Sequence, residues 1–549
     1  MASTIDSTAD ASARPSRPSS PSRPSPDANA APNPGSPELQ PLTGSARLWG
    51  TLALSAATFM NVLDTSIANV SLSAIAGDLG VSPNQGTWVI TSFGVANAIA
   101  VPLTGWLSQR FGQVRLFTVS VMLFVLTSWL CGLAPNMPTL IVLRVLQGLV
   151  AGPMIPLSQA LLLSSYPKAL AGLAMALWSM TTLIAPVMGP LLGGWITDNI
   201  SWPWIFYINI PVGFGAAFVT WSIFRKRESK TRKLPIDSVG LALLVIWVGA
   251  LQIMLDKGQE LDWFHSGEVI ALGLIAVVGL IAFVIWELTE EHPVVDLTLF
   301  KRRNFWAGAL ALSVGYGLFF GNVVLLPLWL QQYMGYTATD AGQVLAPVGL
   351  FALLLSPLVG KNLAKFDPRK FAAFAFLVFA LVLWMRSNFN TQADEFTILI
   401  PTIIQGVAMA FFFIPLVTIT LSGIEPDRIP AASGLSNFVR ITAGSFGTSI
   451  ATTIWQDRAA LHHAQLSEYV SPGVGATNSV MSGLASAGLT PDQALGTINR
   501  LVDQQAYMLA ANDVFYASAL IFLLLIPLVF LAKKSKSGAG GADAAAGAH

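Results

Sequence analysis

The chain of 549 residues is 53% hydrophobic but only 11% charged, and its mean hydropathy is +0.62. Soluble globular proteins carry about 25% charged residues, so this composition excludes an ordinary soluble domain and indicates a membrane protein with many spans. A net charge of +1 provides no basic surface for nucleic acid, and the single cysteine, Cys131, excludes an intramolecular disulfide or a cysteine metal cluster.

Both ends of the chain have the composition of disordered segments. Residues 1–44 are rich in Ser, Pro and Ala and contain the stretch RPSRPSSPSRPSP, with no apolar core of the kind that a signal peptide needs. Residues 536–549 are mostly Gly and Ala. We predict two disordered tails on the cytoplasmic side of a membrane.

Between the tails, fourteen apolar stretches are long enough to cross the ~30 Å hydrocarbon core of a bilayer. They are predicted at 47–72, 87–107, 114–134, 138–163, 169–194, 203–224, 237–256, 268–289, 304–331, 340–364, 370–389, 396–424, 431–455 and 511–532. The fold class is therefore predicted to be an all-α polytopic membrane protein.

The distribution of Lys and Arg sets the orientation, because basic residues collect in cytoplasmic loops. With the N-terminus inside, cytoplasmic segments hold 24 of the 30 basic residues. Two more, Arg144 and Arg440, fall inside spans. The outer side is left with four: Lys257, Arg386, Arg458 and Arg500. We therefore predict fourteen helices with both ends cytoplasmic.

The two halves repeat weakly. The fourth span carries Gln147-Gly148 and the twelfth carries Gln405-Gly406, and a proline follows in each. Parallel repeats of six helices are typical of transporters. The predicted domains are a six-helix bundle at 45–224, an inserted helix pair with its linkers at 225–300 and a second six-helix bundle at 301–535.

Asp64 is the candidate proton carrier, because it lies in the apolar first span within the stretch LDTSIANV. A charge near the bilayer centre costs roughly 2.5–3.5 kcal/mol on insertion scales, so such a group faces the bundle interior and marks an ion or proton path. Arg144 of the fourth span lies at a similar predicted depth and is its candidate partner. Purely structural roles for both residues remain open alternatives.

Five motifs carry a family resemblance: LDTSIANV in the first span, the loop GWLSQRFGQVR, LRVLQGLVAGP in the fourth span, APVMGPLLGG in the fifth and HHAQL after the thirteenth. With these motifs, residues 45–535 resemble the major facilitator superfamily, in its fourteen-helix drug:proton antiporter branch and specifically the EmrB-type multidrug efflux pumps. The chain departs from the usual motifs at Gln109, where the family has an acid, and at Ala185, where it has glycine.

The resemblance implies roles for two groups of residues. The loop after the second span would gate the transporter, and a motif in the fifth span would seal its cavity against leak. The gating residues are Gly105, Arg110, Gly112 and Arg115, and the antiporter-motif residues are Pro186, Gly189, Pro190, Gly193 and Gly194. Generic packing of a kinked helix is the alternative for the second group.

The resemblance also implies that spans one, four, nine and twelve line the substrate pathway. Candidate cavity residues on these spans and on the thirteenth are Gln147, Tyr316, Asn322, Phe411, Phe412 and Arg440. Aromatic side chains suit diverse hydrophobic compounds, although core packing is the simpler explanation for any one of them. For Arg440, the sequence leaves a functional role and simple bonding to backbone carbonyls equally open.

A long polar segment, 456–510, is predicted as an extracytoplasmic loop that is either a solvated cap or a docking surface. We find no GxxxxGK[ST] phosphate loop, no cysteine-histidine metal set and no nucleophile motif, and we expect no cofactor, no metal and no enzymatic activity.

These features predict a proton-driven efflux transporter that exports hydrophobic drug-like molecules across a bacterial inner membrane. The resemblance further implies a tripartite system with a periplasmic adaptor protein and an outer-membrane channel. Two alternatives are a proton-coupled exporter of one native metabolite and a non-transporting sensor with a transporter fold.

Overall fold

A computed structural model describes residues 40–534, apart from 168–169, 233–234, 364 and 471–474. All regular structure among these residues is helical, with no strand, so the predicted all-α class is confirmed. The predicted tail at 536–549 and nearly all of the one at 1–44 lie outside the described residues.

The first half of the chain forms helices of very unequal length. They are α1 (Gly44–Val70), α2 (Leu72–Asp78), α3 (Pro83–Gly86), α4 (Trp88–Ala100), α5 (Thr104–Phe111), α6 (Gln113–Gly132), α7 (Met137–Ala151), α8 (Met154–Ser165), α9 (Ala171–Asn199), α10 (Trp204–Tyr207) and α11 (Asn209–Phe224). Two of the spans are interrupted beside a proline. Helices α4 and α5 meet at a 62° bend beside Pro102, and α7 and α8 are separated by Gly152-Pro153, where proline removes a backbone donor.

The second half follows the inserted pair. The pair is α12 (Ser238–Lys257) and α13 (Gly267–Thr289), and the later helices are α14 (Arg303–Tyr333), α15 (Ala338–Asn362), α16 (Pro368–Arg386), α17 (Glu395–Leu421), α18 (Ile429–Ser467), α19 (Gly475–Ser486) and α20 (Pro491–Phe530). Each of the fourteen predicted spans coincides with one helix or with two consecutive helices among the described residues.

By length and hydropathy alone, ten of the described helices qualify as membrane spans, or eleven when the bent α4–α5 pair is included. Of the other predicted spans, α9 contains side chains outside the described part of the chain, and α1 and α18 are too polar to qualify. These helices carry polar and small residues, such as Asp64 on α1 and Arg440 on α18, that are buried inside the protein. These polar groups contact other helices and not lipid. The segments can therefore cross the membrane although their hydropathy is low.

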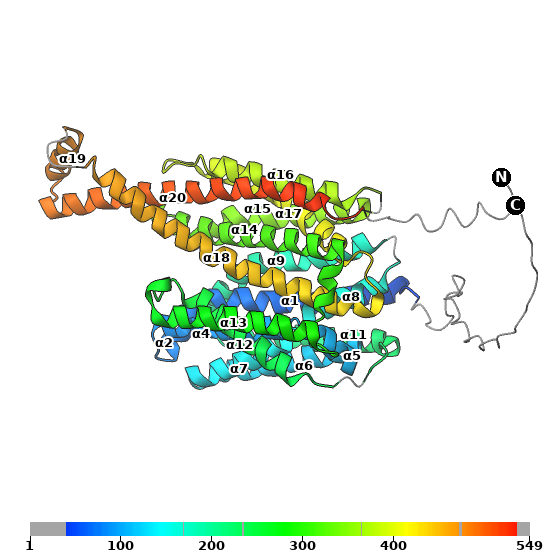
Figure 1. Cartoon of the computed structure of the whole chain (residues 1–549). Coiled ribbons are helices and arrows are strands. Elements are labelled where there is room, and N and C mark those ends of the chain that lie inside the picture. Colours follow the sequence, from blue (N-terminus) through cyan, green and yellow to red (C-terminus); the bar gives the residue numbers. More distant parts are fainter. Residues whose placement is uncertain (1–39, 168–169, 233–234, 364, 471–474, 535–549) are drawn as a thin grey trace, which may run out of the picture. The chain divides into compact units, whose positions relative to one another are not determined.

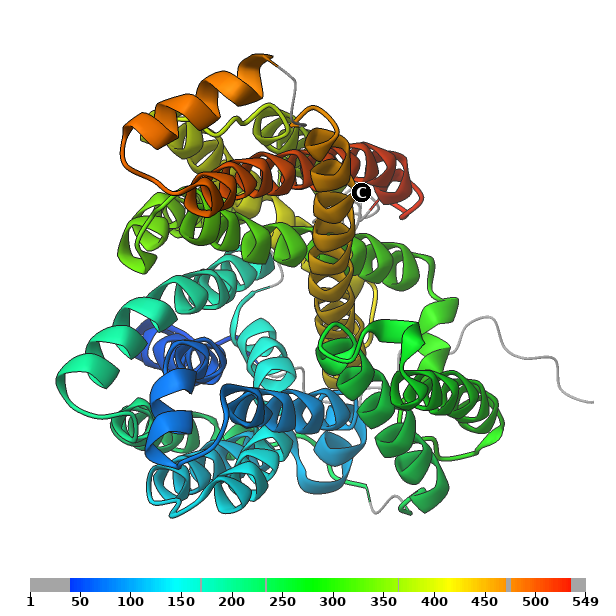
Figure 2. The same cartoon turned by 90° about the vertical axis from the view of Figure 1, so that its left-hand side faces the viewer.

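The two halves share one pattern of helix contacts. Helix α1 packs on α9 and α11, and α14 correspondingly packs on α18 and α20. Helix α7 packs on α4 and α6, as α17 packs on α15 and α16. Figure 2 shows the two sets as separate groups, one blue to cyan and one green to red. The arrangement is a parallel duplication, although the exact domain boundaries stay a prediction.

The inserted pair contacts both sets through α12. Near the end of α12, Lys257 donates to Oγ1 of Thr87 at 2.8 Å, and Ser449 of α18 donates to the backbone oxygen of Leu255 at 2.6 Å. In the middle of α12, Trp247 packs edge-on against Phe438 of α18 with ring centroids 5.7 Å apart. Helix α12 therefore bridges α4 and α18, whereas α13 leaves most of its apolar residues exposed, as a lipid-facing helix does.

The predicted loop 456–510 is largely helical. Helix α18 runs on to Ser467, α19 follows, and α20 begins at Pro491 with a Thr490–Gln493 capping box. In Figure 1, α18 and α20 extend together beyond the neighbouring helices and carry α19 at their tip. Arg458 and His462 of α18 both contact Asp513 of α20, which fixes the pair. We call residues 456–510 the outer hairpin.

Candidate functional site

Asp64 of α1 and Arg144 of α7 form an ion pair in the interior of the first half. Nη1 of Arg144 donates to Oδ2 of Asp64 at 2.6 Å, and both side chains are 0% exposed. Helix α1 is apolar around Asp64 and places the carboxylate in the protein interior. Helix α7 supplies the cation that compensates its charge. A buried pair of this kind is costly to break, because either charge alone would be uncompensated.

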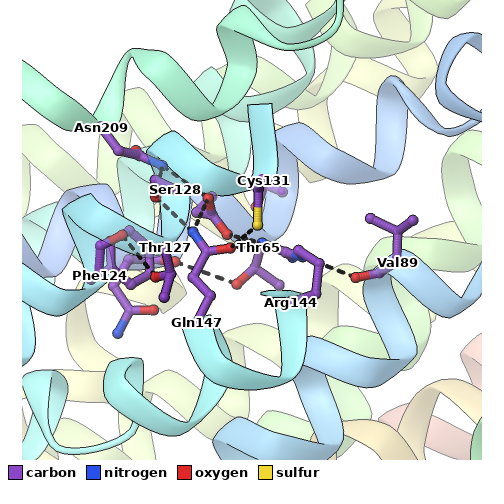
Figure 3. A network of polar contacts seen from close by, with 12 residues as sticks. Thr65, Val89, Phe124, Thr127, Ser128, Cys131, Arg144, Gln147 and Asn209 are labelled. Atoms are coloured by element: carbon purple, nitrogen blue, oxygen red, sulfur yellow. Dashed lines mark hydrogen bonds and ion pairs between the residues drawn. The ribbon is translucent and has the colours of Figure 1, made fainter. Parts of the chain in front are cut away.

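Neighbouring helices complete the shell around the carboxylate (Figure 3). Gln147 and Asn209 donate to Oδ1 of Asp64 at 3.1 and 2.9 Å. Both amides also donate to Ser128, at 2.7 and 3.3 Å, and the thiol of Cys131 lies 3.6 Å from the Gln147 oxygen. We call Asp64, Ser128, Arg144, Gln147 and Asn209 the carboxylate cluster.

The Arg144 guanidinium is held in place by contacts other than the ion pair. Its Nε donates to the backbone oxygen of Val89 at 3.0 Å, and its central carbon lies 4.3 Å from the Phe93 ring centroid and 5.5 Å from that of Phe206. Its Nη2 is buried and has no hydrogen-bond partner among the described residues. Arginine stays charged, so the only group of this cluster suited to proton exchange is Asp64.

Two helices hold the Asp64 carboxylate through hydrogen bonds. Every hydrogen bond to the carboxylate comes from a donor on α7 or α11, an arrangement that suits the ionised form. A proton bound at either oxygen would remove the negative charge that compensates the Arg144 guanidinium.

The antiporter-motif glycines of α9 pack directly on α1 beside Asp64. A methyl group added at Gly189 would lie 2.4 Å from Cβ of Ser66, and one added at Gly193 would lie 3.0 Å from the backbone oxygen of Ile67. Gly194 lies in the same helix, and so do Pro186 and Pro190, whose side chains are outside the described part of the chain. Only glycine permits this approach, which makes α9 sensitive to movement of α1.

The gating-loop residues lie where α5 meets α18 and α6. Gly105 packs on Ala431 of α18, and a methyl group added at Gly105 would lie 2.5 Å from the Ala431 Cβ. Gly112 has φ +88°, a conformation that favours glycine. Arg110 lies over the Trp106 ring with its guanidinium carbon 5.4 Å from the centroid, and Arg115 is exposed.

An acid from outside the loop bonds to the start of the helix that follows the loop. Glu228, in the segment after α11, accepts hydrogen bonds from the backbone nitrogens of Val114 and Arg115 at 2.9 and 2.8 Å. It thereby caps the N-terminus of α6, where a carboxylate is favourable. The backbone nitrogen of Arg232 also donates to the oxygen of Gln109 at 2.8 Å, so this segment holds the loop in place.

The second half contains a counterpart of the carboxylate cluster that lacks the carboxylate. A constant offset of 258 positions relates the two sets: Asp64 corresponds to Asn322, Ser128 to Arg386, Arg144 to Thr402 and Gln147 to Gln405. Arg386 is 1% exposed, and its Nη2 donates to Gln405 at 2.7 Å and to Thr402 at 3.2 Å. Asn322 donates to Ser518 of α20 at 3.1 Å. Arg386, predicted on the outer side, is instead buried in the last turn of α16.

A small cavity lies between the two halves and contains Arg440. Its lining comes from α8 and α9 of the first half and from α14, α17 and α18 of the second. The lining residues are Gln159, Trp178, Leu312, Phe413, Val417, Leu421, Ser433, Ser436, Asn437 and Arg440. Tyr316 lies behind Arg440, with its ring centroid 4.6 Å from the guanidinium carbon.

Several predicted substrate-cavity residues do not line this small cavity, and their role in substrate binding stays a prediction. Gln147 belongs to the carboxylate cluster and Asn322 to its counterpart, and neither lines the cavity. Phe411 packs on Phe371 and Phe374, and Phe412 packs on Phe376 and Phe379, all of α16. Successive residues of a helix point about 100° apart, so of these three adjacent phenylalanines only Phe413 reaches the cavity.

The sequence reasoning missed Asn209, Ser128 and Glu228. Asn209 and Ser128 are single polar residues at helix positions, which ordinarily indicate only a local hydrogen bond. The internal repeat could have identified Ser128. It occupies the same position in the first half as Arg386 does in the second, and Arg386 is a charged residue at the end of a predicted span. Glu228 is surrounded by Arg and Lys residues in the sequence, and nothing in this basic segment indicates that it caps a helix.

Comparison with known proteins gives a consistent result. The profile of the Major Facilitator Superfamily matches residues 54–448. The chain is 51% identical over 511 residues to the multidrug export protein EmrB of Escherichia coli K12, which covers 93% of this chain and 99% of that protein. It is 50% identical over 502 residues to the fatty acid resistance protein FarB of Neisseria gonorrhoeae, which covers 91% and 99%.

The fold agrees with solved transporter structures. The crystal structure of the human organic anion transporter MFSD10 covers 89% of this chain and 100% of its own, with a TM-score of 0.57 at 12% identity. A structure of the XylE double mutant gives a TM-score of 0.51 at 16% identity over 89% of this chain. At such identities the likeness concerns the fold alone.

Proposed function

This chain belongs to the major facilitator superfamily as an EmrB-like membrane transporter without enzymatic activity, and on that premise we propose that it exports hydrophobic, drug-like compounds in exchange for protons. The relatives named for multidrug export and for fatty acid resistance support the exporter part of this proposal, because they match over nearly their whole length.

The observation that carries the proton part is the carboxylate cluster. Among the described residues, Asp64 is the only acid that is fully buried within a span and paired with an arginine. An antiporter needs a group that holds a proton in one state of the cycle and releases it in another, and a carboxylate inside the membrane can do so. Asp64 would carry the proton, and Arg144 would act as its counter-charge when the proton leaves.

Helix contacts provide a route from Asp64 to the second half. Ser66 and Ile67, within a turn of Asp64, pack on Gly189 and Gly193 of α9. At its other end α9 packs on α15, where Gly172 approaches Gly360 so closely that a methyl group on either would meet the other's backbone oxygen at 2.6 Å. A shift of α1 on protonation would therefore move α9 against the second half, as alternating access requires.

The test is transport by the Asp64→Asn variant in proteoliposomes under an imposed pH gradient. Asparagine keeps the shape but cannot carry a proton. We expect the variant to bind a fluorescent substrate of the wild-type protein as tightly as before but to lose gradient-driven transport. Normal gradient-driven transport by Asp64→Asn would refute the assignment of Asp64, and the search would turn to acids near the span ends, such as Glu287.

We also propose the cellular arrangement. The protein would lie in the inner membrane with both ends cytoplasmic, as the distribution of basic residues favours. The outer hairpin, with exposed Tyr469, Val480, Leu495 and Leu501, would then project outward and offer an adaptor protein an apolar surface. Replacement of residues 468–489 by a short Gly-Ser linker should abolish adaptor binding while substrate binding persists. Unchanged adaptor binding would exclude the tip of the hairpin as the contact.

A further inference from the structure

Two acidic side chains are buried together at one end of the inserted pair. Asp237 caps the start of α12 and is 9% exposed, and Glu287 lies in the last turn of α13 and is 3% exposed. Gly240 of α12 stands between them. A methyl group added at Gly240 would lie 2.2 Å from Oδ2 of Asp237 and 2.7 Å from Oε1 of Glu287. Both oxygens therefore border the same small space, which a glycine leaves open.

The two carboxyl groups have unequal sets of hydrogen-bond donors. The backbone nitrogen of Gly240 donates to Oδ1 of Asp237 at 2.8 Å, and Nε1 of Trp286 lies 3.0 Å from each Asp237 oxygen. Glu287 accepts at Oε2 from the backbone nitrogen of Val295 at 3.1 Å, whereas its Oε1 is buried and has no partner among the described residues. The donors around Asp237 stabilise an ionised carboxylate, and Oε1 of Glu287 lacks such support.

No basic side chain compensates the two acids. The described Lys, Arg and His residues form no ion pair with Asp237 or Glu287. Two ionised carboxylates in one buried site would each lose hydration, which costs several kcal/mol per ion, and would also repel one another. The arrangement therefore favours one negative charge shared by two carboxyl groups, as in other carboxylate pairs.

The charged groups on the surrounding elements leave this balance unchanged. In the segment 290–301, Asp296 is bonded to Arg428, and Glu290 adds a further acid near Glu287. Helix α4 carries no charged residue, and Arg440 of α18 lines the cavity between the two halves. The other charged residues of α12, α13 and segment 290–301 are exposed or lie at the opposite helix ends, namely Asp256, Lys257, Glu268, Glu291, His292 and Lys301.

We propose that Asp237 and Glu287 form a second proton-binding site, in which Oε1 of Glu287 holds the proton and donates a hydrogen bond to Oδ2 of Asp237. The proton turns a buried acceptor without a partner into a donor and removes one of two buried negative charges. A metal ion would need more ligands, and the described part of the chain has no group of three or more His, Cys, Asp or Glu side chains that could hold one.

This site is the electrostatic opposite of the carboxylate cluster. Arg144 and two amides surround Asp64 with donors and favour its ionised form, so that a proton there is readily released. Glu287 has no cation and faces a second acid, so its proton is retained. The inference is thus independent of the proposed antiport through Asp64.

The proton at Glu287 fastens the inserted pair to the chain that enters the second half. Val295, which donates to Glu287, belongs to a hydrophobic cluster that includes Trp247 of α12 and Phe305 of α14. Without the proton, two anions would stand between the start of α12 and the end of α13 and would push these helix ends apart. A bound proton therefore keeps this end of the inserted pair closed.

The test is infrared spectroscopy of the purified full-length protein at neutral pH, in a detergent that has no carbonyl group and without substrate. A protonated carboxyl group has a carbonyl band above the amide region, whereas an ionised carboxylate, the ordinary state of an exposed acid at this pH, has none. We expect the spectrum of the wild-type protein minus that of Glu287→Gln to show one such band. The matched control is Glu291→Gln, which removes an exposed acid four residues away and should leave the band in place.

Two further variants identify the proton and its partner. Asp64→Asn should retain the band, because the proton lies on Glu287. Asp237→Asn should shift or abolish the band, because a neutral amide replaces the carboxylate that accepts from Glu287, while asparagine can still cap α12. Glutamine at position 287 can donate to Asp237 as a protonated carboxyl group does, so Glu287→Gln should keep the melting temperature of the wild-type protein.

Three results would overturn the proposal. The first is a Glu287→Gln difference spectrum without a carboxyl band, and the second is a band that Asp237→Asn leaves unaltered. The third is a band that persists in Glu287→Gln and vanishes in Asp64→Asn, which would place the proton on Asp64. Because the spectra are recorded without transport, none of these outcomes depends on whether Asp64 couples proton movement to export.

Discussion

Asn209 donates from its amide nitrogen to Oδ1 of Asp64 at 2.9 Å, while Arg144 donates to Oδ2 of the same carboxylate at 2.6 Å. The proton-carrying group proposed here is thus held from two helices at once, α11 and α7. The charge of Arg144 and the neutral hydrogen bond from Asn209 come from different helices. Each can therefore be removed by its own substitution.

Asn209→Ala tests the neutral hydrogen bond. A hydrogen bond to a charged group contributes about 1.5–3 kcal/mol, and its loss disfavours the ionised carboxylate. We therefore expect Asn209→Ala to remain folded but to transport more slowly than the wild-type protein, because its carboxylate is held from α7 alone. The measurement is the initial rate of substrate transport in proteoliposomes under one fixed pH gradient. A wild-type rate would show that the hydrogen bond from Asn209 does not contribute to transport.

The two buried arginines should respond differently to substitution. Arg144→Gln leaves Asp64 without a counter-charge, and breaking a buried pair in this way costs about 3–5 kcal/mol. Arg386→Gln removes a cation with no carboxylate, so its cost is limited to the bonds with Thr402 and Gln405 and is offset by relief of desolvation. Thermal unfolding in detergent should show the larger fall for Arg144→Gln, and an equal or larger fall for Arg386→Gln would contradict the electrostatic argument.

Gly189→Ala tests the contact between α9 and α1. The added methyl group would lie 2.4 Å from Cβ of Ser66, and overpacking of this kind costs typically about 1–3 kcal/mol. We expect a lower melting temperature together with slower transport. The control is Gly215→Ala on α11, where no atom lies within 4 Å, and there the variant should be neutral or more stable by up to about 1 kcal/mol.

Glu228→Ala tests the cap on α6. The loss of an N-terminal cap costs about 0.5–2 kcal/mol, and the segment around Glu228 would lose its attachment to the gating loop. Trypsin should then cleave faster at Lys230 and Arg232 than in the wild-type protein. Glu291→Ala, which removes an exposed acid after α13, should leave the cleavage rate unchanged. Equal cleavage of both variants would mean that the cap does not hold the loop.

Much of the fold could be predicted from the sequence because apolar stretches and basic loops can be recognised without knowledge of the contacts between helices. A stretch of about twenty apolar residues has few alternatives to a membrane helix, and positively charged loops order such helices across the membrane. Asp64 and Arg144 stood out for the same reason, since a charge inside an apolar run has to be explained. The prediction of a fourteen-helix transporter of the major facilitator fold agrees with the helices and with the relatives.

The rest depended on contacts that one sequence does not contain. Which of Phe411, Phe412 and Phe413 faces the cavity is decided by the rotation of α17, a property of packing and not of composition. The outer hairpin looked like a loop because its helices are polar and supported by each other, as in the contacts of Asp513 with Arg458 and His462. Asn209 could not be assigned to Asp64 because the two residues lie 145 positions apart.

The separation of Asp64 and Arg144 along the chain also affects how the protein is made. The carboxylate leaves the ribosome 80 residues before its partner arginine, which at about 5–20 residues per second is a delay of roughly 4 to 16 s. During that interval α1, whose hydropathy is too low for it to qualify as a span by itself, has no counter-charge to neutralise Asp64. The first helix of this protein is therefore made before the arginine that compensates its buried charge, and the ion pair can form only after α7 has been synthesised.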